Sequence, residues 1–368
     1  MKISIGSKIV EGPWGGGNLF AINLSNYLLD KGHEVIYDLS EPDIDLILLT
    51  DPRSRRESSS TFNHLEIKKY VEYVNPKAVV VQRINECDER KNTDNINEFY
   101  LNASKVADHV VFVSKWLESI YISCGMDASK TSVIYAGANS NIFNSSNLKK
   151  HTQDTKFEIV THHWSSHENK GFNVYKKIDN MLIDPKWRDR IGFTYIGNVS
   201  PKFNLENSLI IKPLAGDDLA SEIKKCHIYV TGSINEPSGN HHIEAAQCGL
   251  PVMYIPSGGI PEYCDNFGVD FQENDFEQRL EYLIDNYDTY YKKLESYPFN
   301  SDKMCSEFYE LFNNLILKKQ DQKEIGKISF LGKFYLKRNK IANKYGFIFS
   351  IAVNLAAILR SKIRGFYE

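Results

Sequence analysis

The chain has 368 residues, which is long enough for two domains with full hydrophobic cores. Hydrophobic residues make up 42% and charged residues 25%, as in ordinary soluble globular proteins, and the net charge of −3 argues against a nucleic-acid-binding protein. Six cysteines without a C-x-x-C pair favour reduced thiols in a cytoplasmic protein and give no zinc framework. The start, MKISIGSKIV, predicts a strand rather than a signal peptide.

The first predicted unit is a strand, a glycine-rich loop and a helix. The strand covers residues 2–6, the loop covers residues 10–18, and apolar residues at helical spacing follow from Leu19 to Leu29. Glycines in such a loop, here including Gly16 and Gly17, let backbone N–H groups approach a phosphate closely. The first domain is therefore expected to bind a phosphorylated ligand, with a simple tight turn as the alternative.

A dinucleotide fingerprint is incomplete in this loop. Counting from Gly15 and Gly17, the third glycine of G-x-G-x-x-G would stand at Phe20. Asp38 nevertheless lies about 20 residues further on, where a ribose-binding acid would stand. A nicotinamide-dependent enzyme therefore stays an alternative.

The rest of the first domain predicts further strands at residues 34–39, 45–50, 78–82, 109–113 and 132–135, with helices between them. A charged loop follows the strand at 78–82. Its charges are either solvated, or Arg83, Asn85 and Asp88 face a cleft and contact an acceptor or phosphates. The first domain is predicted to span residues 1–147, and the polar residues 148–156 are predicted to be a linker.

The second domain is predicted to span residues 157–317. It opens with a strand at 157–162, followed by the segment HHWSSHENKGF and a helix near Phe172. Further strands are predicted at 193–197, 209–212 and 267–271, and helices at 217–226, 275–287 and 301–317. Strands that alternate with helices predict a parallel α/β sheet in each domain.

Residues 226–264 form the most informative stretch. A strand at 226–231, a polar loop at 232–240, a helix at 241–247 and a strand at 252–255 are predicted. Glu236 lies on the loop and Glu244 on the helix, with seven residues between them. Free N–H groups at the helix start favour a phosphate, and carboxylates suit vicinal hydroxyls. The alternative is a solvated Glu236 and a Glu244 that only interacts with the helix dipole.

This stretch resembles the donor-site signature of the GT-B glycosyltransferases, in the large, mostly retaining family of glycosyl transferases group 1 (family 4-like). The amino-terminal GGGNL segment, the Lys170–Gly171 pair and VIYAGANSNIF resemble the same family, so the resemblance covers about residues 1–317. The matching positions in the stretch itself are Glu236, Gly239, Glu244, Ala245, Gly249, Pro251, Val252, Gly258, Gly259 and Glu262.

The resemblance implies two facing Rossmann-like domains, with the last helix crossing back onto the first. It also implies transfer of a sugar from a nucleotide-sugar to an acceptor hydroxyl, in cell-surface polysaccharide or glycolipid assembly. Glu236 would bind donor sugar hydroxyls and Glu244 the ribose, while Lys170 and the N–H groups of Gly16 and Gly17 would stabilise the diphosphate. The remaining donor-binding residues would be Ser238, Gly239, Asn240 and His241. Neither a metal nor a cofactor is expected, and retention is a family inference.

One departure from the family pattern concerns the phosphate site. The family places an arginine about five residues before the lysine, and this chain has Ser165 there. A nearby histidine such as His163 could supply a donor instead, or Arg83 could reach across the cleft. The histidines could also suggest a metal, but no acidic ligand stands at fixed spacing, so loop packing is expected instead.

The tail, residues 318–368, lies outside the resemblance. Twelve basic and three acidic residues give it a net charge of +9, which leaves −12 for the rest. Residues 345–359 form an apolar run that is too short for a spanning helix, which needs about 20 residues. The tail is expected to lie on an anionic membrane, on the inner face of the cytoplasmic membrane, or to fold onto the body or mediate self-association.

Two alternatives accompany the glycosyltransferase prediction besides the nicotinamide enzyme. A sugar-nucleotide epimerase can share the GT-B fold and would release free sugar without any acceptor. A non-catalytic nucleotide-binding protein would fit the missing arginine. The sequence does not distinguish the donor sugar, the nucleotide base or the acceptor, because small differences in pocket loops decide them.

Overall fold

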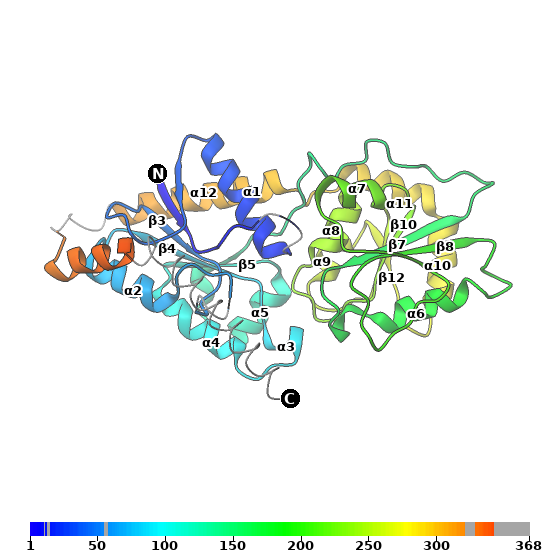
Figure 1. Ribbon diagram of the computed structural model, residues 1–368, viewed down its shortest axis with the longest axis horizontal. Helices are drawn as coiled ribbons and strands as arrows, with labels where there is room; N and C mark the ends of the chain where they lie inside the picture. Colours follow the sequence, from blue (N-terminus) through cyan, green and yellow to red (C-terminus); the bar gives the residue numbers. More distant parts are fainter. Residues whose placement is uncertain (11, 13–14, 55–57, 321–327, 342–368) are drawn as a thin grey trace, which may run out of the picture.

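The computed structural model describes residues 1–10, 12, 15–54, 58–320 and 328–341, and it contains two α/β domains side by side (Figure 1). In the described residues, each domain holds one sheet of six strands, all of them parallel. The α/β architecture with two parallel sheets, predicted from the sequence, is confirmed.

The amino-terminal sheet has the strand order β2-β1-β3-β4-β5-β6. Its central strands are buried along their whole length because helices cover both faces. The strands are β1 (Lys2–Ile5), β2 (Glu34–Ile36), β3 (Leu46–Leu49), β4 (Val79–Ile84), β5 (His109–Phe112) and β6 (Thr131–Val133). The helices are α1 (Gly16–Asp30), α2 (His64–Tyr73), α3 (Asp88–Lys91), α4 (Ile96–Ala103) and α5 (Lys115–Ser123).

The carboxyl-terminal sheet has the order β12-β11-β10-β7-β8-β9. Its strands are β7 (Phe157–His163), β8 (Ile191–Gly197), β9 (Leu209–Ile211), β10 (Ile228–Thr231), β11 (Val252–Tyr254) and β12 (Gly268–Asp270). The helices are α6 (Phe172–Met181), α7 (Gly216–Ile223), α8 (Asn240–Gln247), α9 (Ile260–Cys264), α10 (Phe276–Asp285) and α11 (Tyr287–Lys293). The strand order reverses between β7 and β10, as it does between β1 and β3 in the other domain, and open α/β sheets bind ligands at such switch points.

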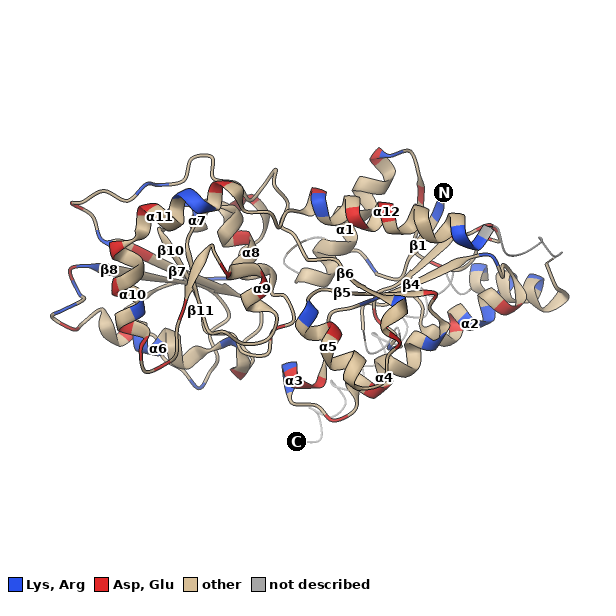
Figure 2. Ribbon diagram, turned by 180° about the vertical axis from the view of Figure 1, so that it is seen from behind, with Lys and Arg blue, Asp and Glu red and all other residues tan. Residues whose placement is uncertain are grey.

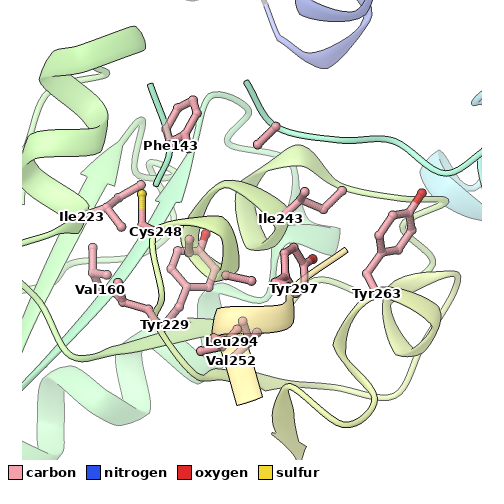
Figure 3. Packing of buried hydrophobic residues seen from close by; sticks show 14 of the residues in the cluster. Phe143, Val160, Ile223, Tyr229, Ile243, Cys248, Val252, Tyr263, Leu294 and Tyr297 are labelled. Atoms are coloured by element: carbon pink, nitrogen blue, oxygen red, sulfur yellow. The ribbon is translucent and has the colours of Figure 1, made fainter. Parts of the chain in front are cut away.

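The segment between β6 and β7 packs on the carboxyl-terminal domain. Phe143 lies in one buried cluster with Ile223 and Cys248 (Figure 3), and Leu148 belongs to the same cluster. The predicted linker thus begins at a residue that is buried in this core, while residues 152–156 are exposed.

The chain returns to the amino-terminal domain in α12 (Ser301–Gln320), which lies beside α1 (Figure 1). Phe308 of α12 packs against Phe20 of α1 with 5.2 Å between the ring centroids. Both residues belong to the core beneath the amino-terminal sheet. The two domains are therefore joined twice, once after β6 and once before α12.

A further helix at residues 330–341 packs beside α2, at the end of the molecule far from the carboxyl-terminal domain (Figure 1). Tyr335 is buried there, and its hydroxyl donates to the carbonyl of Glu66 at 2.9 Å. Part of the predicted tail thus packs on the body of the protein. The apolar run at 345–359 lies outside the described residues.

Candidate active site

A cavity of about 380 Å³ lies between the carboxyl ends of the two sheets. The loops that follow β1, β4, β7 and β10 line it, together with the end of β8. Its size is that of a small-molecule site, and its position next to both switch points is where α/β sheets place ligands.

Two helix amino termini meet in this cavity. α1 begins at Gly16 and α8 begins at Asn240, and neither has a side-chain cap. A Cβ atom on Gly16 would lie 2.8 Å from Oδ1 of Asn240, so the two termini touch across the domain boundary. Free N–H groups and the positive ends of two helix dipoles therefore favour an anionic ligand between them.

Glu236 lies in this cavity between two cations. Its side chain is buried, Lys170 binds its Oε2, and Nη2 of Arg90 lies 3.3 Å from its Oε1. Burial by itself would raise the pKa of Glu236, but the charges of Lys170 and Arg90 outweigh burial and lower this pKa to about 2. The carboxylate is therefore ionised throughout the neutral range.

Glu244 is the second buried carboxylate of the cavity. Its Oε2 lies 2.9 Å from Nε2 of His162, which is also buried. Nδ1 of His162 has no hydrogen-bond partner among the described residues. The pair therefore offers polar atoms at the wall of the cavity that a hydroxyl-bearing ligand would satisfy.

The other histidines of the cavity are uncharged at neutral pH. Burial lowers the pKa of both His163 and His241 well below the usual value, because it penalises the protonated form. His163 hydrogen-bonds the hydroxyl of Tyr175, and Nε2 of His241 lies 3.0 Å from the hydroxyl of Thr231. A neutral histidine can donate a hydrogen bond, but it cannot supply the positive charge of an arginine.

Arg83 brings a buried positive charge to the cavity wall from the end of β4. Its guanidinium lies over the ring of Phe20, 4.0 Å from the centroid. Burial lowers the pKa of Arg83 to about 10, so the side chain stays charged at neutral pH. Within the described parts of the chain, no carboxylate lies within ion-pair distance of the Arg83 guanidinium. An anionic group of a ligand would give this guanidinium an ion-pair partner.

Most of the predicted site residues come together in this cavity, and Asp88 is the exception. Its carboxylate accepts hydrogen bonds from the N–H groups of Ile96 at 2.8 Å and Asn97 at 2.9 Å, so it joins α3 to α4 instead of facing the ligand. The predicted residues that line the cavity are Gly16, Gly17, Arg83, Asn85, His163, Lys170, Glu236, Ser238, Gly239, Asn240, His241 and Glu244.

Sequence reasoning did not assign a role to Arg90, and it considered His162 only as a possible hydrogen-bond donor to the phosphates, not as the partner of Glu244. Arg90 lies two residues after Asp88 in the same charged segment. The charge of this segment indicated a possible site there, but it did not indicate which residue would contact a ligand. His162 precedes His163 at the end of β7, and no pattern in the sequence shows which of the two side chains reaches Glu244.

The described residues contain no group of three or more histidine, cysteine, aspartate or glutamate side chains arranged to hold a metal ion. Asp43 and Asp45 lie at the opposite, amino-terminal edge of the sheet. There Asp43 pairs with Nζ of Lys2 at 2.8 Å, and Asp45 accepts from the Lys2 N–H at 2.7 Å. Both carboxylates therefore bind Lys2 at the start of β1.

The two facing sheets with a cleft between their carboxyl edges define a GT-B protein. Residues 198–297, which contain both Glu236 and Glu244, match the family model described as Glycosyl transferases group 1. This match and the fold confirm the resemblance to the GT-B glycosyltransferases that the sequence predicts. No curated protein matches the chain.

Solved structures with the same fold include three that match almost over their full length. HepE from Anabaena, in complex with UDP and glucose, is 15% identical, with 85% of this chain and 99% of that chain covered and a TM-score of 0.61. Sucrose-phosphate synthase from Thermosynechococcus elongatus is 15% identical, with 86% and 99% covered and a TM-score of 0.62. The lipopolysaccharide outer core galactosyltransferase WaaB is 13% identical, with 87% and 100% covered and a TM-score of 0.61.

Proposed function

We propose that the protein transfers a sugar from a nucleoside diphosphate sugar to an acceptor hydroxyl. The observation that carries this proposal is the convergence of two helix amino termini and Lys170 with two buried carboxylates in one cavity. Helix termini and a lysine suit a diphosphate, and Glu236 and Glu244 suit the hydroxyls of a sugar and a ribose.

In the proposed reaction, negative charge builds on the diphosphate as the bond to the sugar breaks. Lys170 and the N–H groups at the starts of α1 and α8 would stabilise this charge, which is the main catalytic task of the site. Glu236 would hold the donor sugar by its hydroxyls, and Glu244 would hold the ribose.

We further propose that the transfer is retaining and needs no metal. Among the described residues that line the cavity, the carboxylates are Glu236 and Glu244, and each is already engaged by a basic side chain. This supports a front-face mechanism in which the leaving phosphate oxygen takes the acceptor proton. The cations around the cavity support charge neutralisation by the protein itself, and unchanged turnover after EDTA treatment would agree with this.

The solved neighbours favour particular substrates. HepE is described with UDP and glucose, and WaaB as a galactosyltransferase of the lipopolysaccharide outer core. We therefore propose a hexosyl donor and a glycan or lipid-linked glycan acceptor, in the assembly of a cell-surface polysaccharide or glycolipid.

We also propose contact with an anionic membrane through residues 318–368. The helix at 330–341 supports this, because Phe330, Leu331 and Phe334 are 85%, 56% and 64% exposed and Lys333 and Lys337 are exposed among them. Apolar side chains beside lysines suit an anionic lipid surface. No helix in the described parts of the chain is long and apolar enough to cross a bilayer.

Vesicle sedimentation tests this contact. The full chain should sediment with phosphatidylglycerol vesicles and stay in solution with phosphatidylcholine vesicles. Replacing Phe330 and Phe334 by serine should reduce binding, and unchanged binding of that variant would exclude the helix at 330–341 from the contact.

The catalytic proposal is tested by donor binding and turnover. A thermal-shift panel of UDP, GDP, ADP and their sugars should show a shift for one nucleotide, about 2.7 kcal/mol of stabilisation at a hundred times the dissociation constant. Glu244→Ala should remove the shift, and Glu236→Ala should lower turnover by orders of magnitude. A near-normal rate in Glu236→Ala would overturn the assignment. Free sugar released at full rate without acceptor would favour an epimerase, and a donor left intact with every acceptor would favour a non-catalytic protein.

A further inference from the structure

Among the described residues that line the cavity, the carboxyl-terminal domain supplies one lysine or arginine, Lys170. Lys170 is present, but Ser165 occupies the place where an arginine is expected, and its hydroxyl accepts the N–H of His167 at 3.2 Å. The neighbouring His163 is neutral because burial lowers its pKa. A diphosphate leaving group carries more negative charge than one lysine neutralises, so a second cation beside Lys170 and the two helix amino termini would stabilise it further.

Arg90 of the amino-terminal domain lies beside Lys170 at the expected diphosphate position. Nη2 of Arg90 and Nζ of Lys170 bind the two oxygens of the same carboxylate, that of Glu236. Both side chains line the cavity, and Arg90 remains about 29% exposed, so a ligand in the cavity can reach it. Arg83, by contrast, lies over the ring of Phe20, and the described ion pairs of Glu236 are with Arg90 and Lys170.

The loops of the carboxyl-terminal domain hold the backbone of α3 in place. Nδ2 of Asn169 donates to the carbonyl of Arg90 at 2.8 Å, and Nδ2 of Asn235 donates to the carbonyl of Glu89 at 3.2 Å. Asn169 directly precedes Lys170, and Asn235 directly precedes Glu236. Both figures place α3 on the side of its domain that adjoins the carboxyl-terminal domain (Figures 1 and 2). Each of the two loops that carry the charged site residues therefore also positions Arg90.

We propose that Arg90 is the second cation of the donor diphosphate site, supplied across the domain boundary in place of the arginine that is absent at position 165. This inference rests on the proposed function, because it requires a nucleoside diphosphate in the cavity. Without a donor, Arg90 and Lys170 both neutralise Glu236. When the diphosphate enters, the two cations turn to it, since a planar guanidinium binds phosphate oxygens in pairs, and Glu236 becomes free for the sugar hydroxyls.

This exchange links donor binding to the arrangement of the two domains. Lys170 and Arg90 belong to different domains, so a diphosphate that binds both holds the domains together. An enzyme that takes both cations from one domain does not have this link. In this protein, loss of Arg90 should therefore weaken the binding of diphosphates and leave the binding of the nucleoside part unchanged.

Isothermal titration calorimetry tests the proposal. The dissociation constants to compare are those of the nucleoside diphosphate identified by the thermal-shift panel, of the corresponding nucleoside monophosphate and of the nucleoside. Arg90→Gln should weaken nucleoside diphosphate binding by about 10- to 100-fold, the effect of losing charge-assisted hydrogen bonds. The loss for the monophosphate should be smaller, and the nucleoside should bind unchanged. Arg90→Lys, which keeps the charge but not the paired geometry, should fall between the wild type and Arg90→Gln.

Lys91→Gln is the matched control. Lys91 lies on the same helix and loses the same charge. Like Arg90 it pairs with Glu86, but it is 48% exposed, and among the described residues only Arg90 of the two pairs with Glu236 and lines the cavity. If Arg90→Gln and Lys91→Gln bind the diphosphate equally well, the proposal is overturned. If the wild type binds no nucleoside diphosphate at all, the proposed function itself fails.

A double-mutant comparison separates direct binding from an action through Glu236. In the Glu236→Gln background, removal of Arg90 should still weaken diphosphate binding, because the guanidinium contacts the phosphates. If Arg90→Gln has no effect in that background, Arg90 acts only by holding Glu236, and the proposal is overturned.

Discussion

The carboxylate of Glu262, in the carboxyl-terminal domain, accepts the backbone N–H of Trp116, in the amino-terminal domain, at 2.8 Å. Its other oxygen accepts the N–H of Lys115 at 2.8 Å and the hydroxyl of Tyr135 at 2.9 Å. An acid at the first turn of α5 satisfies N–H groups that the helix leaves free and also interacts with the helix dipole. One domain thus stabilises the helix start of the other.

Glu262→Ala should therefore loosen the connection between the domains. We expect a loss of about 1–2 kcal/mol, as for other helix caps, and a calorimetric unfolding transition that broadens or splits in two. Glu295→Ala, which removes an exposed carboxylate from the same domain, should leave the transition unchanged. A single transition at the wild-type temperature in Glu262→Ala would show that this cap does not couple the domains.

Glu236 should make stability depend on pH in the acidic range. Its pKa of about 2 in the folded protein lies below the ordinary value of 4.5. The ionised carboxylate therefore stabilises the fold above about pH 4.5, and this contribution is lost as the pH falls towards 2. Glu236→Gln should unfold at a lower temperature than the wild type at pH 7, and the difference between the two melting temperatures should shrink below pH 4.5 and vanish only as the pH approaches 2. A constant difference at all pH values would contradict the ion pairs with Lys170 and Arg90.

Arg83 should show a conflict between stability and function. A buried guanidinium without a carboxylate partner among the described residues is costly, and methionine has a similar length without the charge. Arg83→Met should raise the melting temperature by about 2 °C or more, even though the contact with Phe20 is lost. The same variant should turn over more slowly, because the charge faces the cavity. A lower melting temperature would show that the charge is better solvated than its burial indicates.

Gly171 should tolerate no side chain. Its φ of +81° favours glycine, and a Cβ atom would lie 2.2 Å from the carbonyl oxygen of Gly232. Gly171→Ala should cost about 3 kcal/mol or more and should displace the adjacent Lys170. Gly125→Ala is the control, because Gly125 has a φ of +97° with no atom near its Cβ position, so it loses only about 1–2 kcal/mol. Equal melting temperatures in the two variants would show that the loop after β7 yields easily.

The order of strands and helices could be predicted from the sequence, because it depends on residues that are neighbours along the chain. The strand predicted from Cys226 begins at Ile228, and the helix predicted from His241 begins at Asn240. Alternation of apolar segments with glycine and polar loops is enough to predict such units. The helix after the glycine loop begins earlier than predicted, at Gly16, because the glycines themselves adopt helical backbone at its first turn.

The composition of the site was only partly accessible. Glu236 and Glu244 were found because both lie within one stretch at fixed spacing. Asp88 was assigned to the cleft, but the N–H groups of the following helix α4 take its carboxylate, and a charged loop read alone does not show this competition.

The sequence by itself determined two parallel α/β domains, the glycine loop and the paired carboxylates, since local periodicity and spacing encode them. Only the tertiary structure decided that Arg90 meets Glu236, that His162 meets Glu244 and that Glu262 stabilises the start of α5. Each of these pairs joins residues at least 82 positions apart, and two of them cross the domain boundary. Such pairs follow from how the sheets face each other, which no local pattern in the chain records.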